Sequence, residues 1–103
     1  MRMYLISDNT DTQMGLRLAG IEGVIVHEKE ELHRVLEEVK QDEAIGILLV
    51  TTAVFNLDRD KLQDLKLNSK RPLIVEISDR HKSHEVQAMI DETISKIIGR
   101  KIG

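Results

Sequence analysis

Four short runs of apolar residues along the chain predict β-strands. Three of the four are nearly continuous rather than alternating, and the clearest is Ile-Leu-Leu-Val at residues 47–50. Strands that are buried on both faces have this pattern, so we expect a parallel sheet covered by helices on both sides. The four predicted strands are Met3–Ser7, Gly23–Val26, Ile45–Thr51 and Leu73–Ile77.

The segments between these strands have helical periodicity. A first helix is expected after Asn9, where Thr10 and Gln13 have the spacing of a capping box. Gly20 can supply the left-handed residue that ends this helix. A second helix is expected from about Glu28 to Gln41. A third is expected from about Ala53 to Leu65, with a weaker pattern around Asn56–Asp60.

The end of the chain carries the most regular apolar pattern. The spacing of three and four residues predicts one face of an amphipathic helix over residues 84–99, after a hinge loop over residues 78–83. This helix either packs on its own sheet or binds another protein. The apolar positions of its face are Val86, Met89, Ile90, Ile94, Ile97 and Ile98.

Strands and helices alternate regularly, which indicates one α/β domain over residues 1–103, with a body over residues 1–77. Short connections and right-handed crossovers favour three layers, with a four-stranded parallel sheet of order 2-1-3-4, flanking helices and the amphipathic C-terminal helix.

Composition and charge exclude several classes of partner. The net charge of −3 and the presence of only one Tyr, one Phe and no Trp argue against a nucleic-acid surface. The absence of cysteine excludes disulfides and thiol nucleophiles. The first apolar run meets the charged Asp8 too early to be a signal peptide. No apolar run approaches the ~20 residues of a membrane span, so we expect no direct membrane insertion.

Candidate chemistry is confined to the predicted carboxyl ends of the strands, where ligands bind in this architecture. The turn from Asp8 to Asp11 has two carboxylates and no glycine, which argues against phosphate binding. These carboxylates suit Mg²⁺ in a receiver-like signalling domain, but Thr51 and Thr52 stand where such a domain needs a carboxylate nucleophile. We favour a simpler role, in which both aspartates interact with the positive end of the first helix.

Histidine offers little further chemistry. His81 and His84 have a spacing that suits two metal ligands, with Asp79 nearby. However, a structural zinc site needs four ligands, and Arg80 and Lys82 oppose a cation there. We therefore expect a solvated loop at this point, and no metal, cofactor or catalytic residue in the chain.

Three stretches of the chain together match a known family. Residues 15–20 read Gly-Leu-Arg-Leu-Ala-Gly, residues 46–51 read Gly-Ile-Leu-Leu-Val-Thr, and residues 71–77 read Arg-Pro-Leu-Ile-Val-Glu-Ile. They resemble the Gly-Phe-Arg-Leu-Ala-Gly signature, the third strand and the proline-led fourth strand of the F subunit, a small central-stalk protein of V-type and A-type rotary ATPases. The chain departs from the family at Ala53 and Ser78, where the family often has glutamate and proline.

The resemblance implies a noncatalytic rotor protein that binds the coiled-coil D subunit of the central stalk and helps couple ATP synthesis or hydrolysis to H⁺ or Na⁺ transport. It implies a cytoplasmic location, peripheral to the membrane, with the catalytic head and the membrane-ring adaptor subunit as further partners. The alternatives are a receiver-like signalling domain without a phosphoacceptor and an adaptor module of another complex.

Two helices carry the residues expected to contact a partner, the first helix and the last. Core packing explains each of the aliphatic residues among them equally well, whereas an arginine is seldom wholly buried without a partner. The expected partner-binding residues are Met14, Leu16, Arg17, Ile90, Ile94, Ile97, Ile98 and Arg100.

Overall fold

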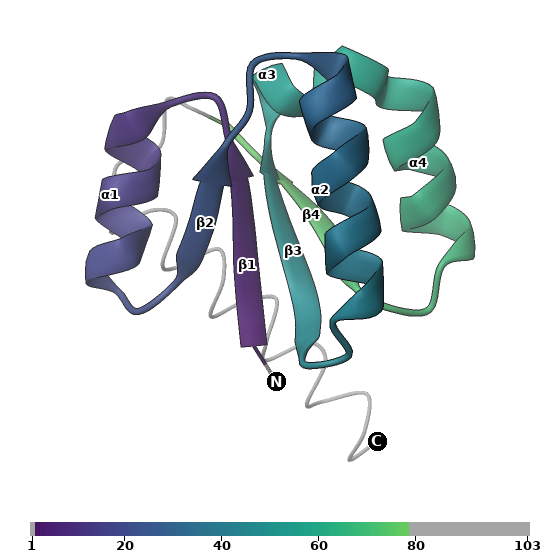
Figure 1. The fold of residues 1–103 in the computed structure, drawn as a ribbon, viewed down its shortest axis with the longest axis horizontal. Helices are drawn as coiled ribbons and strands as arrows, with labels where there is room; N and C mark the ends of the chain where they lie inside the picture. Colours follow the sequence, from purple (N-terminus) through teal and green to yellow (C-terminus); the bar gives the residue numbers. More distant parts are fainter. Residues whose placement is uncertain (1, 79–103) are drawn as a thin grey trace.

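The computed structural model of this chain describes residues 2–78 (Figure 1). The predicted last helix lies outside the described residues, as does the predicted hinge loop except for Ser78. In chain order the described elements are β1 (Arg2–Ser7), α1 (Thr10–Leu18), β2 (Glu22–Ile25), α2 (Lys29–Gln41), β3 (Ile45–Thr51), α3 (Thr52–Phe55), the short 3₁₀ helix η1 (Asn56–Asp58), α4 (Arg59–Asn68) and β4 (Leu73–Ile77).

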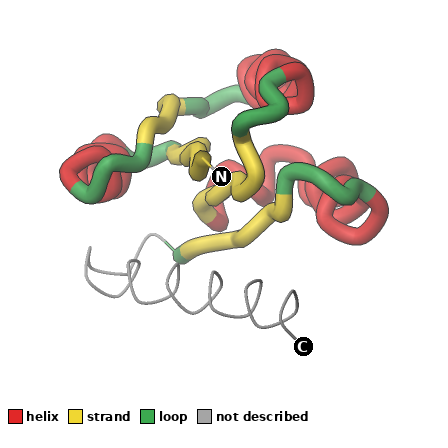
Figure 2. Tube along the Cα trace, turned by 90° about the horizontal axis from the view of Figure 1, so that it is seen from below, coloured by secondary structure: helices red, strands yellow, loops and turns green. Residues whose placement is uncertain are grey.

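The four described strands form one parallel sheet with the order β2-β1-β3-β4, which confirms the predicted topology. Helix α1 lies on one face of the sheet, and α2 and α4 lie on the other (Figure 2). The three layers place the carboxyl ends of the strands beside the starts of α1, α2 and α3, because every crossover returns the chain in the same direction.

Two apolar clusters hold these layers together, one on each face of the sheet. Successive strand residues point to opposite faces, so Ile6 packs under α2 and α4 while its neighbour Leu5 packs under α1. Phe55 and Leu62 are fully buried in the larger cluster. Burial on both faces accounts for the continuous apolar run in β3.

Helix α1 begins one residue earlier than the predicted capping box requires. Asn9 is the N-cap residue, and its Oδ1 accepts from the backbone N–H of Asp11 at 2.8 Å. The predicted box of Thr10 and Gln13 is therefore wrong, because an asparagine is already in the cap position and caps well. The Gln13 side chain instead donates to the carbonyl oxygen of Gly23 in β2 at 2.9 Å, and so fastens α1 to that strand.

The end of α1 agrees with the sequence. Gly20 has φ of 87°, a left-handed conformation that glycine adopts without steric cost. Its N–H donates to the Arg17 carbonyl, and the N–H of Ile21 donates to the Leu16 carbonyl, both at 2.9 Å. These two bonds form a Schellman motif, and the buried side chains of Leu16 and Ile21 supply its apolar contact.

A second glycine lets two strands approach closely. A Cβ atom at Gly23 would lie 2.7 Å from the Leu5 Cβ and 2.8 Å from the Leu5 carbonyl oxygen. Any side chain at this position would push β2 away from β1. The sequence of β2 therefore has glycine where the strands would otherwise clash.

The predicted third helix is two α-helices in the structure, with the 3₁₀ helix η1 between them. Instead of one helix from Ala53 to Leu65, α3 and η1 are followed by a fresh start of α4 at Arg59. Asp58 ends the first segment and caps the second, since its Oδ1 accepts from the backbone N–H of Lys61 at 3.3 Å. The weak pattern around Asn56–Asp60 marks this break.

Candidate partner-binding surface

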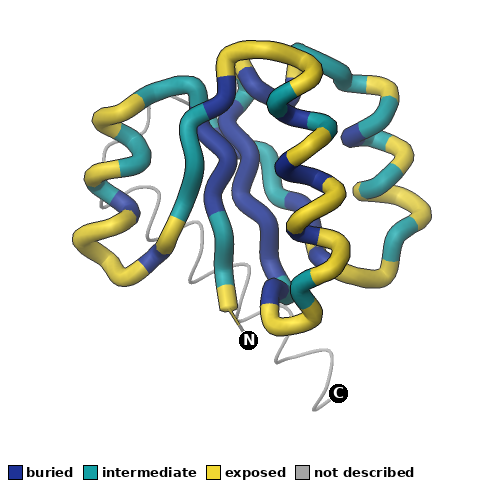
Figure 3. Tube along the Cα trace, viewed as in Figure 1, coloured by how far each residue is buried: buried dark blue, intermediate teal, exposed yellow. Residues whose placement is uncertain are grey.

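The outward side of α1 carries an exposed apolar ridge. Met14 is 59% exposed and Leu18 is 92% exposed, and Arg17 beside them is also exposed. Positions i, i+3 and i+4 lie together on one side of a helix, so these three residues form a single surface. We call it the α1 ridge, and Figure 3 shows the exposed outward side of this helix.

Leu16 lies beneath this surface rather than in it. Only 2% of the residue is exposed, and it packs against Leu5 and Leu49 of the sheet. Leu16 therefore supports the ridge from the core and makes no surface of its own, contrary to the expectation that it faces a partner. Leu18, which the sequence interpretation did not name among the partner-binding residues, is exposed instead. Two positions amount to about 200° around a helix, so a buried Leu16 directs Leu18 to solvent.

A groove of about 280 Å³ runs between α1 and the edge strand β2. It is lined by Tyr4, Gln13, Arg17, Glu22 and Gly23, so Arg17 borders both the groove and the ridge. Burial, together with the nearby carboxylates of Glu38 and Glu22, raises the pKa of the Tyr4 phenol. Tyr4 packs against the larger cluster, and the other polar side chains that line the groove are an amide, a cation and a carboxylate.

The carboxyl ends of β1 and β3 are joined by hydrogen bonds. The Thr51 hydroxyl donates to Asp8 Oδ1 at 2.9 Å, and the Asp8 N–H donates to the Thr51 hydroxyl oxygen at 3.4 Å. Ser7 and Thr51 are fully buried. Among residues 2–78 no group of three or more His, Cys, Asp or Glu side chains is placed to hold a metal ion. Asp11 stays exposed in the first turn of α1, where a carboxylate favours the positive helix end.

A histidine–carboxylate hydrogen bond and an ion pair fix the segment that connects β3 to α4. His33 Nε2 of α2 lies 2.7 Å from Asp58 Oδ2, and this hydrogen bond is the main reason that the pKa of Asp58 is lowered. The Arg59 guanidinium lies 3.1 Å from Glu76 Oε2 and 4.6 Å from the centre of the Phe55 ring. Its hydrogen bonds are the main cause of the lowered pKa of Glu76.

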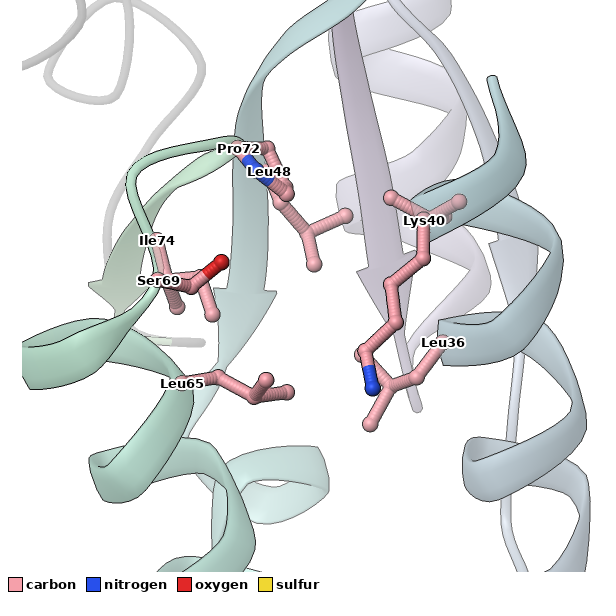
Figure 4. Close-up of a pocket in the computed structure, with 8 residues that line it drawn as sticks. Leu36, Lys40, Leu48, Leu65, Ser69, Pro72 and Ile74 are labelled. Carbon is pink, nitrogen blue, oxygen red and sulfur yellow. The ribbon is translucent and has the colours of Figure 1, made fainter. Parts of the chain in front are cut away.

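A small apolar cleft lies between α2 and α4. Figure 4 shows the side chains of Leu36 and Leu65 on its two sides, with Lys40 and Ser69 at its rim. Its volume is about 10 Å³. A space of that size holds about one water molecule, so this cleft excludes a metabolite or nucleotide.

Several predicted residues lie outside the described part of the chain. They are Asp79, His81 and His84 of the candidate metal loop and Ile90, Ile94, Ile97, Ile98 and Arg100 of the last helix. Within residues 2–78, none of the helices combines the length and the apolar character that crossing a membrane requires. Of the predicted partner-binding residues within residues 2–78, Met14 and Arg17 lie exposed on α1 and Leu16 is buried beneath them.

Comparison with known proteins covers nearly the whole chain. The profile of a family described as ATP synthase (F/14-kDa) subunit matches residues 3–97. The A-type ATP synthase F subunit of Methanocaldococcus jannaschii is 31% identical over 100 residues, which is 96% of each chain. The F subunit of Methanosphaera stadtmanae is 30% identical over 96 residues, covering 91% of this chain and 90% of the relative. That of Thermoplasma acidophilum is 33% identical over 94 residues, covering 90% of this chain and 88% of the relative.

Proposed function

The chain belongs to the family of ATP synthase (F/14-kDa) subunits, and from this membership we propose that it is a noncatalytic central-stalk protein of a V/A-type rotary ATPase. In this role it binds the coiled-coil stalk subunit and helps couple ATP synthesis or hydrolysis to H⁺ or Na⁺ transport. The assignment implies a peripheral position on the cytoplasmic side of the membrane. The catalytic head and the membrane-ring adaptor subunit are its further neighbours.

The α1 ridge is the observation that carries the proposed interaction with the coiled-coil stalk subunit. Met14 and Leu18 expose large apolar side chains that belong to neither apolar cluster of the described residues. Burying a side chain of this size against a partner is worth about 1.5–3 kcal/mol. Arg17 adds a cation that fits a carboxylate on the partner. A helix of a coiled coil, with apolar and acidic positions one turn apart, matches this arrangement.

The carboxyl ends of the strands support the noncatalytic part of the proposal. Asp8 is hydrogen-bonded to Thr51, and the end of β3 presents Thr51 and Thr52 rather than a carboxylate nucleophile. The hydroxyl of Thr52 itself donates to the Ile77 carbonyl oxygen at 3.3 Å. Within residues 2–78 the polar groups at this edge therefore bond to one another.

The last helix is the second proposed contact with the stalk. Its residues Ile90, Ile94, Ile97, Ile98 and Arg100 lie outside the described part of the chain, so the proposal for them rests on their sequence pattern. Each isoleucine is worth about 1.5–3 kcal/mol when it moves from water to an apolar site. A partner must therefore replace most of the apolar area that this helix would otherwise bury on its own sheet.

Binding of the full chain to the purified coiled-coil stalk subunit tests the α1 ridge. Leu18→Asn removes an exposed apolar side chain, and we expect the Kd to rise by a factor of about 10 to about 100. Leu67→Asn on α4 is the matched control, because Leu67 is also largely exposed, at 78%, but lies on the other face of the sheet. The control should bind the stalk protein as the unchanged chain does.

Arg17→Glu tests the charged part of the same surface. It should weaken binding most at low salt, where an unscreened carboxylate on the partner now meets a like charge. If Leu18→Asn and Arg17→Glu both bind the coiled-coil stalk subunit with unchanged affinity, the α1 ridge is not the contact.

A further inference from the structure

A second surface lies at the connection between α4 and β4. Residues 65–75 contain three cations and no carboxylate. Lys66, Lys70 and Arg71 are all exposed, and Leu67 between them is 78% exposed. We call these four residues the basic patch. A local excess of positive charge is unusual here, because the whole chain has a net charge of −3.

The carboxylates that flank this segment in the sequence are already engaged. The amide of Asn68 donates to Asp64 Oδ1 at 2.6 Å, and Glu76 is paired with Arg59 at 3.1 Å. Lys70 and Arg71 form no ion pair with any residue in the described range 2–78. Within residues 2–78, these two exposed cations therefore have no carboxylate partner.

The turn that presents these cations is held in one conformation. The Ser69 N–H donates to the Leu65 carbonyl at 3.0 Å, and the Ser69 hydroxyl donates to the Arg71 carbonyl at 2.9 Å. The next residue, Pro72, is buried. An ordered backbone lowers the entropy lost on binding, which suits a contact surface.

Stabilisation of the helix end explains only part of the patch. Cations in the last turn complement the negative end of a helix, and this accounts for Lys66. Arg71 lies beyond the end of α4, so this effect does not require it. Leu67 points away from the core, since Leu65 on the opposite side of the helix packs against the larger cluster. An exposed apolar side chain among cations that form no ion pair within residues 2–78 suits contact with another macromolecule.

We propose that the basic patch binds an acidic segment of a second protein of the assembly, in which an apolar side chain covers Leu67 and carboxylates pair with Lys70 and Arg71. This protein is different from the one at the α1 ridge, because α1 and α4 lie on opposite faces of the sheet (Figure 2). The chain then connects two partners. The inference rests on the proposed function in one respect, which is that the second partner belongs to the same assembly.

A protein fits these observations better than an anionic membrane surface. The chain is negative overall, so a broad negative surface would repel it, whereas a short acidic segment is attracted by the patch alone. Charges separated by more than about 10 Å are largely screened at 0.1 M salt, which favours such a local contact.

Cross-linking in the assembled ATPase identifies the partner. A photoreactive amino acid replaces Leu67 in the full chain, and the same group replaces Leu18 in a second sample. We expect the position 67 adduct on a protein segment with at least two carboxylates, in a polypeptide other than the one cross-linked from position 18. An adduct at position 67 that is on lipid, on the segment reached from position 18, or absent altogether would overturn the proposal.

Charge reversal tests the energetics with a matched control. The probe is the ATPase complex purified without this protein, to which full-length chain is added back. Arg71→Glu should raise the concentration needed for half-maximal rebinding about tenfold at low salt, and the difference should shrink as salt rises. Arg34→Glu makes the same charge change at an exposed residue of α2 that has no ion pair within the described residues, and it should rebind normally.

Failure of the basic patch and failure of the proposed function give different results. If Leu18→Asn leaves binding to the coiled-coil stalk subunit unchanged but Arg71→Glu still weakens rebinding, only the assignment of the α1 ridge fails. Equal effects of Arg71→Glu and Arg34→Glu refute the basic patch. Binding of the unchanged chain, but not of Arg71→Glu, to vesicles of anionic lipid would also refute it, because the patch would then recognise lipid.

Discussion

Replacement of Gly23 by alanine should destabilise the protein through a steric clash between two strands. The added Cβ would lie 2.7 Å from the Leu5 Cβ and 2.8 Å from the Leu5 carbonyl oxygen. Both atoms belong to or adjoin the backbone of β1, so they cannot move aside as the end of a flexible side chain can. Overpacking of this kind costs about 1–3 kcal/mol.

The unfolded chain reduces this loss slightly. Alanine restricts the unfolded backbone more than glycine does, which stabilises the folded state by about 0.4–1 kcal/mol. The expected net loss is therefore about 1–2 kcal/mol. For a chain of this size that corresponds to a decrease in Tm on the order of 5–10 °C.

Urea unfolding of the full chain, followed by circular dichroism, measures this change. The midpoint should fall while the slope m stays constant, because the variant unfolds the same surface. Leu5→Ala in the same chain should not rescue Gly23→Ala, since the close Cβ and carbonyl oxygen remain. If Gly23→Ala is as stable as the unchanged chain within about 0.5 kcal/mol, or if Leu5→Ala rescues it, then the close approach of β1 and β2 does not explain the glycine.

Two further predictions concern the side-chain pairs that hold α4. The pKa of Asp58 is lowered below its ordinary value of 3.8, mainly by the hydrogen bond from His33, so the folded state binds this proton less readily than the unfolded state does. This stabilisation is thus present above about pH 3.8 and is lost as the pH falls through the lower pKa of the folded state. Asp58→Asn should therefore reduce the loss of unfolding free energy at acid pH. An unchanged dependence of the unfolding free energy on acid pH in this variant would contradict the prediction. Arg59→Lys keeps the charge but loses the paired hydrogen bonds to Glu76 and the stacking on Phe55. We therefore expect the free energy of unfolding, measured in urea, to fall by about 1 kcal/mol. An unchanged free energy of unfolding would show that the guanidinium geometry is unimportant.

The order of strands and helices could be predicted from the sequence because it depends on local patterns. The apolar run of β3 is continuous because both faces of that strand are buried, and this burial is visible in the sequence itself. The end of α1 was equally predictable, since Gly20 has a φ of 87° and few residue types other than glycine tolerate that conformation. In both cases the residues that decide the structure are neighbours along the chain.

The break between α3 and α4 could not be predicted in the same way. Asp58 caps α4, but it is held there by His33, which lies 25 residues earlier in the chain. Helical periodicity alone connects Ala53 to Leu65 and contains no information about this distant contact. The predicted N-cap of α1 was wrong by one residue, because both Asn9 and Thr10 can cap a helix and Asn9 does so.

The partner-binding surface stays a prediction, but the structure shows which residues of α1 are exposed. The sequence indicated the region of Met14 and Arg17, but it grouped Leu16 with them and overlooked Leu18. Two leucines of the same helix have opposite roles, and only the direction of the core distinguishes them. The basic patch was missed because its meaning depends on Asp64 and Glu76 being engaged elsewhere, which a sequence does not show.

The hydrogen bond from Gln13 to the Gly23 carbonyl has a consequence for assembly. An outermost strand with free backbone groups can recruit a strand from another molecule, and repeated recruitment of this kind leads to fibres. Here a side chain from α1 already occupies one of those acceptors. That acceptor is therefore not free to pair with a strand of another molecule, which makes the β2 edge a poorer template for such recruitment.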